Sequence, residues 1–207
     1  PFSHLFDARL VKGVNPSSSF EHEFASTGIL DILIKSNGLE KAIERHGLTP
    51  ADIHFVQELI LGDDHQLPEG FKWVGREGKE FLYDIVANKR NGIDVDKFDY
   101  FARDCKSLGL TKSFDETRLM KFARVFDVCR NKTTKKELCY HAKEAWNIFE
   151  LFHTRYALHK RAYQHRVATV VELMIAEALI LADPYIKIPG TGGALRRMSE
   201  CPDDLEA

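Results

Sequence analysis

The sequence predicts a mostly α-helical fold that contains one short β-hairpin. Apolar residues recur at helical spacing along most of the chain, and residues 22–36 give the first example. Residues 122–128 and 138–142 are instead short runs rich in aromatic or β-branched side chains, which favour strands. With 207 residues, 44% of them hydrophobic, the chain is long enough to bury a sizeable core.

The first predicted helices begin and end at recognisable signals. Residues 22–36 form one helix, and Gly38 follows it as a stop. The run Thr49–Asp52 supplies an N-cap, a proline at the first helical position and an acid at the third, so a helix is expected from there to Gly62. Residues 63–78 contain proline, glycines and many charges, which predicts a surface loop.

The middle of the chain predicts three further helices. Residues 79–90 have a helical pattern, and residues 94–107 form the next predicted helix, which ends near Gly109. Ser113 and Glu116 fit a capping box that would start the third helix.

The last third of the chain combines the hairpin with the longest helices. Residues 122–128 and 138–142 flank the polar run RNKTTKKE, which predicts a β-hairpin. Residues 144–182 form the longest helical stretch and are expected to be two helices or one helix with a bend. From Lys187 onward, proline and several glycines predict a loop.

Composition excludes some classes of function and leaves others open. The formal net charge is −2, so any basic site for a polyanion must be local. The longest apolar run, residues 167–182, is interrupted by Glu172 and Glu177, which argues against a membrane partner. The four cysteines form no CxxC pair, as expected for reduced thiols. Neither end of the chain carries a start, capping or closing signal, which predicts a piece of a longer protein.

Three polar residues lie four positions apart within the long helical stretch. Arg155, His159 and Tyr163 would lie along one face of a helix. The guanidinium suits phosphate oxygens, the imidazole can move a proton near neutral pH, and the tyrosine offers a ring and a hydroxyl. The alternative is a solvated polar face with a half-buried tyrosine. The many cationic and titratable side chains in HTRYALHKRAYQHR favour a nucleotide site over that alternative.

A second polar group, Asp96, Lys97, Tyr100 and Asp104, would span about 100 degrees of a helix. In such a group Asp96 can bind a hard cation, Lys97 can bind a phosphate, and the other two can hold a sugar hydroxyl. The alternative is ordinary surface pairing, for example of Lys97 with Asp94, and spacing alone favours this alternative.

A third group consists of His4, Asp7 and His22. A carboxylate that orients an imidazole fixes its tautomer for acid–base chemistry. The alternative is that both histidines are structural, because local spacing alone does not identify such a group.

Several stretches of the chain together resemble a known enzyme family. The runs NKRNGIDVDKFDYFARDC, KFARV and FHTRYALHKRAYQHRV closely resemble the SAM-and-HD-domain deoxynucleoside triphosphate triphosphohydrolases of vertebrates, members of the HD-domain superfamily. PFSHLFD, FEHEF, LIKSNGLEKAIERHGLTP and ADPYIKIPGTGG fit the same family. The similarity runs in order over nearly the whole chain.

This resemblance implies an HD-domain-like helical core that hydrolyses a deoxynucleoside triphosphate to the deoxynucleoside and inorganic triphosphate. We expect residues 1–186 to be part of that catalytic core and residues 187–207 to be a loop leading to a further lobe. The resemblance implies a divalent metal, Mg, Mn or Fe, to which Asp96 would be one ligand. The other ligands, a histidine and a His-Asp doublet, are expected upstream of Pro1. One carboxylate cannot hold a divalent ion firmly, so we expect weak or no hydrolysis by this chain alone.

The resemblance also implies roles for individual residues. The catalytic group beside the scissile bond matches His4, Asp7 and His22. Arg155 would hold phosphates, and Tyr163 would leave no room for a 2′-hydroxyl. The complete set that matches the substrate pocket is Lys97, Tyr100, Asp104, Arg155, His159, Tyr163 and Gln164.

The family is activated by GTP or deoxynucleotides bound between the subunits of a homo-tetramer. His141 stands where the family has an arginine, which puts base selection or affinity at this regulatory site in doubt. Arg166 stands where the family has a lysine, and the two side chains bind phosphate in different geometries. The run RNKTTKKE is longer than the family's turn. The matching regulatory positions are Arg118, Phe122, His141, Lys143, Asn147, His165, Arg166 and Val167.

The sequence therefore leaves three alternative functions. The first is catalysis as part of a triphosphohydrolase. For this function the resemblance implies roles in dGTP catabolism and antiviral defence, and a nuclear rather than cytoplasmic location. The second is a non-catalytic module that binds dNTP or GTP and assembles with other subunits. The third is binding of single-stranded nucleic acid, which the net charge does not favour although the basic run 155–166 could contribute. A reading frame with a His-Asp doublet before PFSH would favour the first function over the second.

Overall fold

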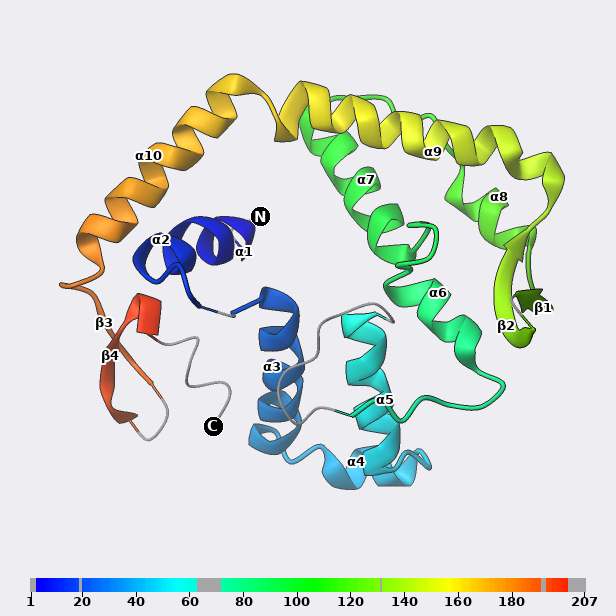
Figure 1. The fold of residues 1–207 in the computed structure, drawn as a ribbon, viewed down its shortest axis with the longest axis horizontal. Helices are drawn as coiled ribbons and strands as arrows, with labels where there is room; N and C mark the ends of the chain where they lie inside the picture. The colour runs from blue at the N-terminus through cyan, green and yellow to red at the C-terminus, as the bar shows by residue number, and fades with distance from the viewer. Residues whose placement is uncertain (1–2, 19, 63–71, 131, 191–192, 201–207) are drawn as a thin grey trace. The chain divides into compact units, whose positions relative to one another are not determined.

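The computed structural model describes residues 3–18, 20–62, 72–130, 132–190 and 193–200. These residues are mostly helical, as the sequence predicted (Figure 1). The chain divides into two compact units. Unit 1 comprises Pro1–Ile43 and Gln164–Ala207, and unit 2 comprises Glu44–Tyr163.

Unit 1 packs its first helical segments against its last long helix. Its helical elements include α1 (Ser3–Leu5), the π-helix η1 (Phe6–Val11), α2 (Lys12–Val14), α3 (His22–Ser36) and α10 (Arg166–Ala182). The segment η1 contacts α10 and buries Leu10 and Val11. A Cβ atom added to Gly13 would lie 2.9 Å from Cδ1 of Ile180 on α10, so glycine allows this close approach. The predicted helix over residues 22–36 is confirmed.

The end of unit 1 corrects the prediction of a loop from Lys187. Strand β3 (Lys187–Pro189) pairs antiparallel with β4 (Leu195–Arg197). Asp183 is buried at the end of α10 and accepts hydrogen bonds from the backbone nitrogen and hydroxyl of Ser199, at 2.9 and 2.7 Å. Strands of three residues are too short to show an alternating pattern, and this non-local bond between Asp183 and Ser199 is not visible in the sequence. The final residues, 201–207, lie outside the described ranges.

Unit 2 has its core between three helices. These helices are α7 (Val95–Leu108), α8 (Glu116–Lys121) and α9 (Ala145–Leu158). Phe101 and Cys105 on α7 pack with Leu151 and Leu158 on α9, one turn or two turns apart along each helix. Ile93, Phe114 and Leu119 complete the buried cluster. The core therefore fixes the two helices that carry the predicted polar groups.

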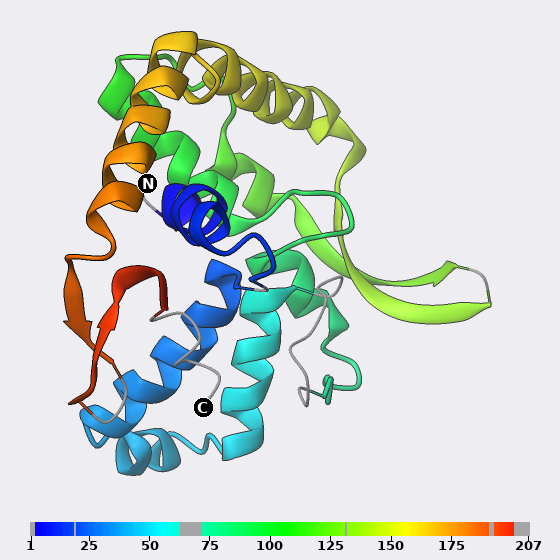
Figure 2. The same cartoon turned by 60° about the vertical axis from the view of Figure 1, so that its left-hand side comes forward.

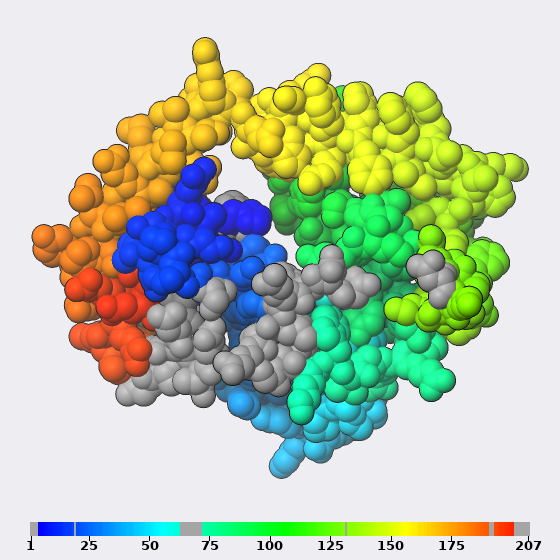
Figure 3. Space-filling model, viewed as in Figure 1, coloured from blue at the N-terminus to red at the C-terminus, as the bar shows by residue number. Residues whose placement is uncertain are grey.

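The helix α9 buries only one of its faces. Its side chains, yellow in Figure 3, lie along the surface of unit 2. Trp146 is 69% exposed and Phe149 54% exposed, and their rings stack with centroids 5.0 Å apart. The opposite face carries Leu151 and Leu158, which are fully buried.

Two predicted helix starts in unit 2 are confirmed. Helix α5 (Pro50–Leu61), which follows α4 (Glu40–Arg45), begins after Thr49, whose backbone nitrogen and hydroxyl donate to Asp52. Helix α7 begins after Asp94, whose carboxylate accepts from the backbone nitrogen of Lys97 at 3.1 Å. Gly109 ends α7 in the left-handed conformation, at φ 66°.

Two other predictions in unit 2 need correction. The helix expected over residues 79–90 is only the 3₁₀ turn η2 (Glu80–Leu82) and α6 (Tyr83–Val86). The Asn88 side chain accepts from the backbone nitrogens of residues 90 and 91, and such side-chain bonds compete with helix formation. Helix α8 is capped by Asp115, which accepts from the Arg118 nitrogen, and not by Ser113. The predicted loop over residues 63–78 lies partly outside the described ranges.

The predicted β-hairpin is confirmed, with longer strands than expected. Strand β1 (Ala123–Arg130) pairs with β2 (Thr133–Tyr140), so most of RNKTTKKE lies in strands and not in a long turn. The ribbon projects from the helices of unit 2 (Figure 2). Its base is held by Asp84 of α6, which accepts from the backbone nitrogen of Leu138 at 2.9 Å and pairs with Arg90.

The long helical stretch consists of two helices joined by a π-helix, as the prediction of two helices allowed. Helix α9 continues into η4 (His159–Tyr163), and α10 follows from Arg166. Within the described ranges, none of the helices combines the length and the apolar character that crossing a membrane requires.

Candidate functional site

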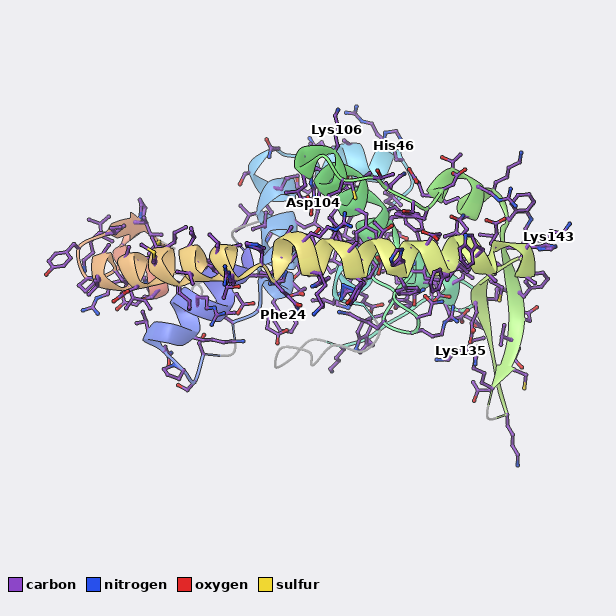
Figure 4. The ribbon with its side chains drawn as sticks, turned by 90° about the horizontal axis from the view of Figure 1, so that it is seen from above. Phe24, His46, Asp104, Lys106, Lys135 and Lys143 are labelled. Carbon is purple, nitrogen blue, oxygen red and sulfur yellow. The ribbon has the colours of Figure 1, made fainter. Side chains whose placement is uncertain are left out.

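The polar faces of α7 and of α9 with η4 meet inside unit 2. The Tyr163 hydroxyl on η4 donates a hydrogen bond to Oδ2 of Asp104 on α7. The Tyr100 and Tyr163 rings lie 6.4 Å apart between centroids. Figure 4 shows Asp104 beside the C-terminal end of α9. The two groups that the sequence singled out separately therefore meet at Tyr100, Asp104 and Tyr163 and form one polar surface there.

Arg155 and His159 form the second part of this surface. They lie one turn apart, and the Arg155 Nη1 atom is 2.8 Å from Nε2 of His159. The His159 ring stands edge-on to the Tyr163 ring, with centroids 5.1 Å apart. A guanidinium, an imidazole and a phenol ring thus follow one another along α9 and η4, and Tyr100 faces Tyr163 from α7.

Burial favours the neutral forms of Tyr100, Tyr163 and His159. Burial, more than any nearby charge, raises the pKa of Tyr100 to about 12. Burial and then the bond to Asp104 raise the pKa of Tyr163 above its ordinary value. Burial and then the charge of Arg155 lower the pKa of His159. The surface therefore offers neutral hydroxyl groups and a neutral imidazole near neutral pH.

Asp96 and Lys97 lie on the first turn of α7. Desolvation, and then the Asp94 carboxylate, raise the pKa of Asp96. The Lys97 ammonium lies 3.1 Å from Oδ2 of Asp94, so the pairing that was the alternative interpretation of this residue is present. A phosphate would have to compete with Asp94 for this lysine.

The metal that the resemblance implies can be compared with the side chains present. Among the described residues, no group of three or more histidine, cysteine, aspartate or glutamate side chains is placed to hold a metal ion. Asp96 can supply one carboxylate ligand, and a divalent cation needs several ligands from fixed elements. The described residues therefore do not form a metal site by themselves.

Unit 1 brings His4, Asp7 and His22 together. Oδ2 of the buried Asp7 lies 3.2 Å from Nδ1 of His22, and the rings of His4 and His22 meet edge-on at 4.7 Å. Glu23 also lies 3.2 Å from the same His22 nitrogen. Lys12 lies 3.5 Å from the other Asp7 oxygen, which is buried and accepts no hydrogen bond from the described residues. The imidazole of His22 thus lies against a carboxylate, which is the arrangement that the acid–base interpretation of this group requires. Gln164, also in unit 1, is exposed.

A third cluster lies at the other end of α9, around Glu144. This fully buried carboxylate accepts from Nε of Arg118 at 2.8 Å and from Nδ2 of Asn147 at 3.0 Å. The Arg118 guanidinium lies over the Phe122 ring, 5.4 Å from its centroid. Asn147 is also bonded in both directions to the backbone of Asp115. Three of the predicted regulatory residues therefore share one network.

His141 and Lys143 border this network. The His141 ring lies 6.2 Å from the Phe122 ring, and its Nδ1 atom accepts from the Lys143 backbone nitrogen at 3.0 Å. The remaining regulatory positions, His165, Arg166 and Val167, are exposed at the start of α10 in unit 1. Figure 4 shows Lys143 and Asp104 toward opposite ends of α9. Asn147 and Arg155 are separated by about 12 Å along the helix axis, given 1.5 Å per residue.

Sequence reasoning missed two residues of these clusters. Glu144 carries no motif, although its spacing of three residues from Asn147 could have indicated a contact on a helix. Lys12 follows Asp7 by five residues, which is the spacing of a π-helix and not of an α-helix. A search for pairs at α-helical spacing therefore does not find it.

Comparison with known proteins identifies the relatives of this chain. No family model matches it. The sequence is 47% identical over 219 residues to the deoxynucleoside triphosphate triphosphohydrolase SAMHD1 of Xenopus laevis, and 46% identical over 211 residues to that of Homo sapiens. Both alignments cover 100% of the chain. The chain is homologous to SAMHD1.

The likeness to SAMHD1 extends beyond vertebrates. A SAMHD1 homolog of Dictyostelium discoideum is 40% identical over 91% of the chain. The chain spans about a third of the length of these relatives, 34% of the frog protein and 33% of the human one. The resemblance predicted from the sequence is confirmed, and it includes the stretches that carry the three clusters.

Proposed function

We propose that this chain carries nucleotide-holding and proton-transferring parts of a deoxynucleoside triphosphate triphosphohydrolase. One observation carries the proposal: in unit 2, Arg155 and His159 lie in one polar surface with Tyr100, Asp104 and Tyr163. Homology to proteins named for this reaction supports the same assignment.

Unit 2 would hold the nucleotide. The Arg155 guanidinium presents several donors to phosphate oxygens, and His159 can add a further donor beside it. Tyr163 and Asp104 would face the deoxyribose, because a hydroxyl and a carboxylate together can donate to and accept from a sugar 3′-hydroxyl. Lys97 would turn from Asp94 toward a phosphate. Fixing the triphosphate in this way orients the α-phosphorus for attack.

The resemblance, and not the placement of the two units, assigns the proton transfer to the His22 group of unit 1. The carboxylate of Asp7 accepts from Nδ1 of His22, which leaves Nε2 of His22 as the proton-carrying atom. When water bonds to the α-phosphorus, the bond from phosphorus to the 5′-oxygen breaks and that oxygen needs a proton. His22, with His4 beside it, is suited to give this proton and to recover it from the attacking water. A metal in the complete enzyme would supply charge neutralisation, and no step here depends on it.

The cluster around Glu144 would bind a regulatory nucleotide. Arg118 and Phe122 offer a cation and an aromatic ring to a base, and Lys143 adds a cation for phosphate. His141 has fewer donors than an arginine, so we expect altered selection of the activating GTP or dNTP at this position. Assembly into a tetramer, a nuclear location and a role in antiviral defence are proposed from the resemblance alone.

A non-catalytic nucleotide-binding module is the alternative, and one assay separates the two functions. The purified chain is incubated with dGTP and Mg²⁺ or Mn²⁺, and the products are resolved by anion-exchange chromatography. We expect dGTP to bind and to be hydrolysed slowly, giving deoxyguanosine and triphosphate in equal amounts. Release of dGDP or orthophosphate would refute the proposed reaction. Binding without any product would support the alternative, whereas retention of turnover after His22→Ala would refute the proposed role of His22.

A further inference from the structure

We propose that Arg155 and His159 form a phosphate-responsive pair: a bound triphosphate draws the guanidinium away from the imidazole, and His159 takes up a proton from solvent. This inference rests on the proposed function, because it concerns the same nucleotide surface. It adds a coupling between ligand binding and protonation, located at one nitrogen atom.

The hydrogen bond between the two side chains fixes the protonation state of the histidine. An arginine side chain has donors only and keeps its charge at any ordinary pH. At 2.8 Å from Nη1 of Arg155, the His159 Nε2 atom must therefore accept, so it carries no proton. In the absence of a ligand, His159 is a neutral imidazole whose free proton lies on Nδ1.

The surroundings of His159 maintain this state. Its desolvation and the charge of Arg155 both disfavour the imidazolium form. The edge-on Tyr163 ring covers one side of the imidazole, and Tyr163 is itself bonded to Asp104. Among the described residues, Arg155 and Tyr163 lie against His159 along its own helical segment, and Tyr100 and Asp104 of α7 in turn contact Tyr163.

An anionic ligand would reverse this balance. Phosphate oxygens are hydrogen-bond acceptors, and so is an Nε2 atom that carries no proton. An unprotonated Nε2 atom that faces a phosphate therefore has no hydrogen-bond partner there. Protonation of Nε2 turns it into a charge-assisted donor, and the ligand's negative charge compensates both cations. The proton comes from the buffer and bonds to Nε2, and no other bond is made or broken. Binding should then be accompanied by proton uptake, and affinity should fall as pH rises through the titration of this pair.

The test is calorimetric titration of the chain at a pH of about 6.5, where an ordinary imidazole is half-protonated. Inorganic triphosphate and dGTP are each titrated in two buffers of different ionisation enthalpy, which gives the protons taken up per ligand. We expect wild type to exceed His159→Gln by up to about one proton per ligand. His153→Gln is the matched control, because His153 lies on the same helix with its side chain 56% exposed. It should behave as wild type.

Arg155→Gln supplies a second arm that does not depend on the histidine substitution. Without the guanidinium beside it, His159 is already more protonated before the ligand arrives, so its uptake should be smaller than in wild type. Equal uptake in wild type and His159→Gln, with both binding, would overturn the pair while leaving the proposed function intact. Failure of wild type to bind either ligand would overturn both.

Discussion

Tyr163 and Asp104 are 59 residues apart in the sequence and share a hydrogen bond from hydroxyl to carboxylate. This bond joins η4 to α7 and closes the polar surface of unit 2. The core beneath it, with Phe101 and Leu158 fully buried, holds the two helices in place. The candidate site therefore depends on packing as well as on its own polar groups.

Removal of this hydrogen bond should lower the stability of the chain and its affinity for dGTP without unfolding the chain. Tyr163→Phe keeps the ring and deletes the donor, and we expect a loss of about 1 kcal/mol in stability because Asp104 remains partly hydrated. Affinity for dGTP should fall severalfold. Urea unfolding and calorimetry measure the two effects. Tyr156→Phe is the control, since Tyr156 is 61% exposed. Equal effects of the two substitutions would show that the bond has no role.

Alkaline titration should reveal the buried tyrosines. Desolvation raises the pKa of Tyr100 and of Tyr140 to about 12 in the folded chain. Unfolded tyrosine loses its proton near a pH of about 10, so above that point the unfolded state binds fewer protons than the native state. The contribution of these two tyrosines to the free energy of unfolding is thus fully present below a pH of about 10 and is lost as pH rises toward 12.

Absorbance of tyrosinate measured against pH, together with urea unfolding at each pH, would show this decline. Tyr100→Phe and Tyr140→Phe should each remove one late-titrating component. Titration of both residues together with the exposed tyrosines would contradict the expectation.

The buried carboxylate of Glu144 should be a sensitive point of the regulatory cluster. Glu144→Gln replaces an acceptor by an amide that cannot accept from both Arg118 and Asn147 in the same geometry. We expect a loss of about 2 kcal/mol in the free energy of unfolding. Asp99→Asn, which breaks an exposed ion pair with Arg103, should change stability by less than about 0.5 kcal/mol. Similar unfolding midpoints for both variants would contradict the role of Glu144.

The catalytic group in unit 1 should affect turnover and not binding. Asp7→Asn removes the carboxylate that orients His22, and His22→Asn removes the proton carrier. Each should lower kcat by roughly 100-fold or more, as for other acid–base groups. The Kd for dGTP should stay within about threefold, because the proposed holding residues lie in unit 2. A large change in Kd with unchanged kcat would contradict this division of roles.

Local signals allowed much of the fold to be predicted. The cap at Thr49, the stop at Gly109 and the bounds of α3 follow from the residues at those positions. The hairpin base was not predictable, because the bond from Leu138 to Asp84 joins residues 54 apart. Contacts of this kind depend on tertiary packing, which local propensity does not encode.

The same distinction holds for the candidate site. Helical spacing grouped Arg155, His159 and Tyr163 correctly along one side, and it grouped Tyr100 with Asp104. That the two groups meet could not be predicted from spacing, since their contact runs between α7 and η4. Spacing also favoured the pairing of Lys97 with Asp94, which is present in the structure.

We propose that one polar surface in unit 2 holds a deoxynucleoside triphosphate. Calorimetric titration of dGTP into wild type, Arg155→Gln and Arg45→Gln tests it most directly, because Arg45 is an exposed arginine of the same unit. We predict that Arg155→Gln weakens the affinity for dGTP at least tenfold, which is about 1.4 kcal/mol. Arg45→Gln should leave the affinity unchanged. If both substitutions weaken binding equally, or if neither weakens it, the nucleotide is not held at this surface.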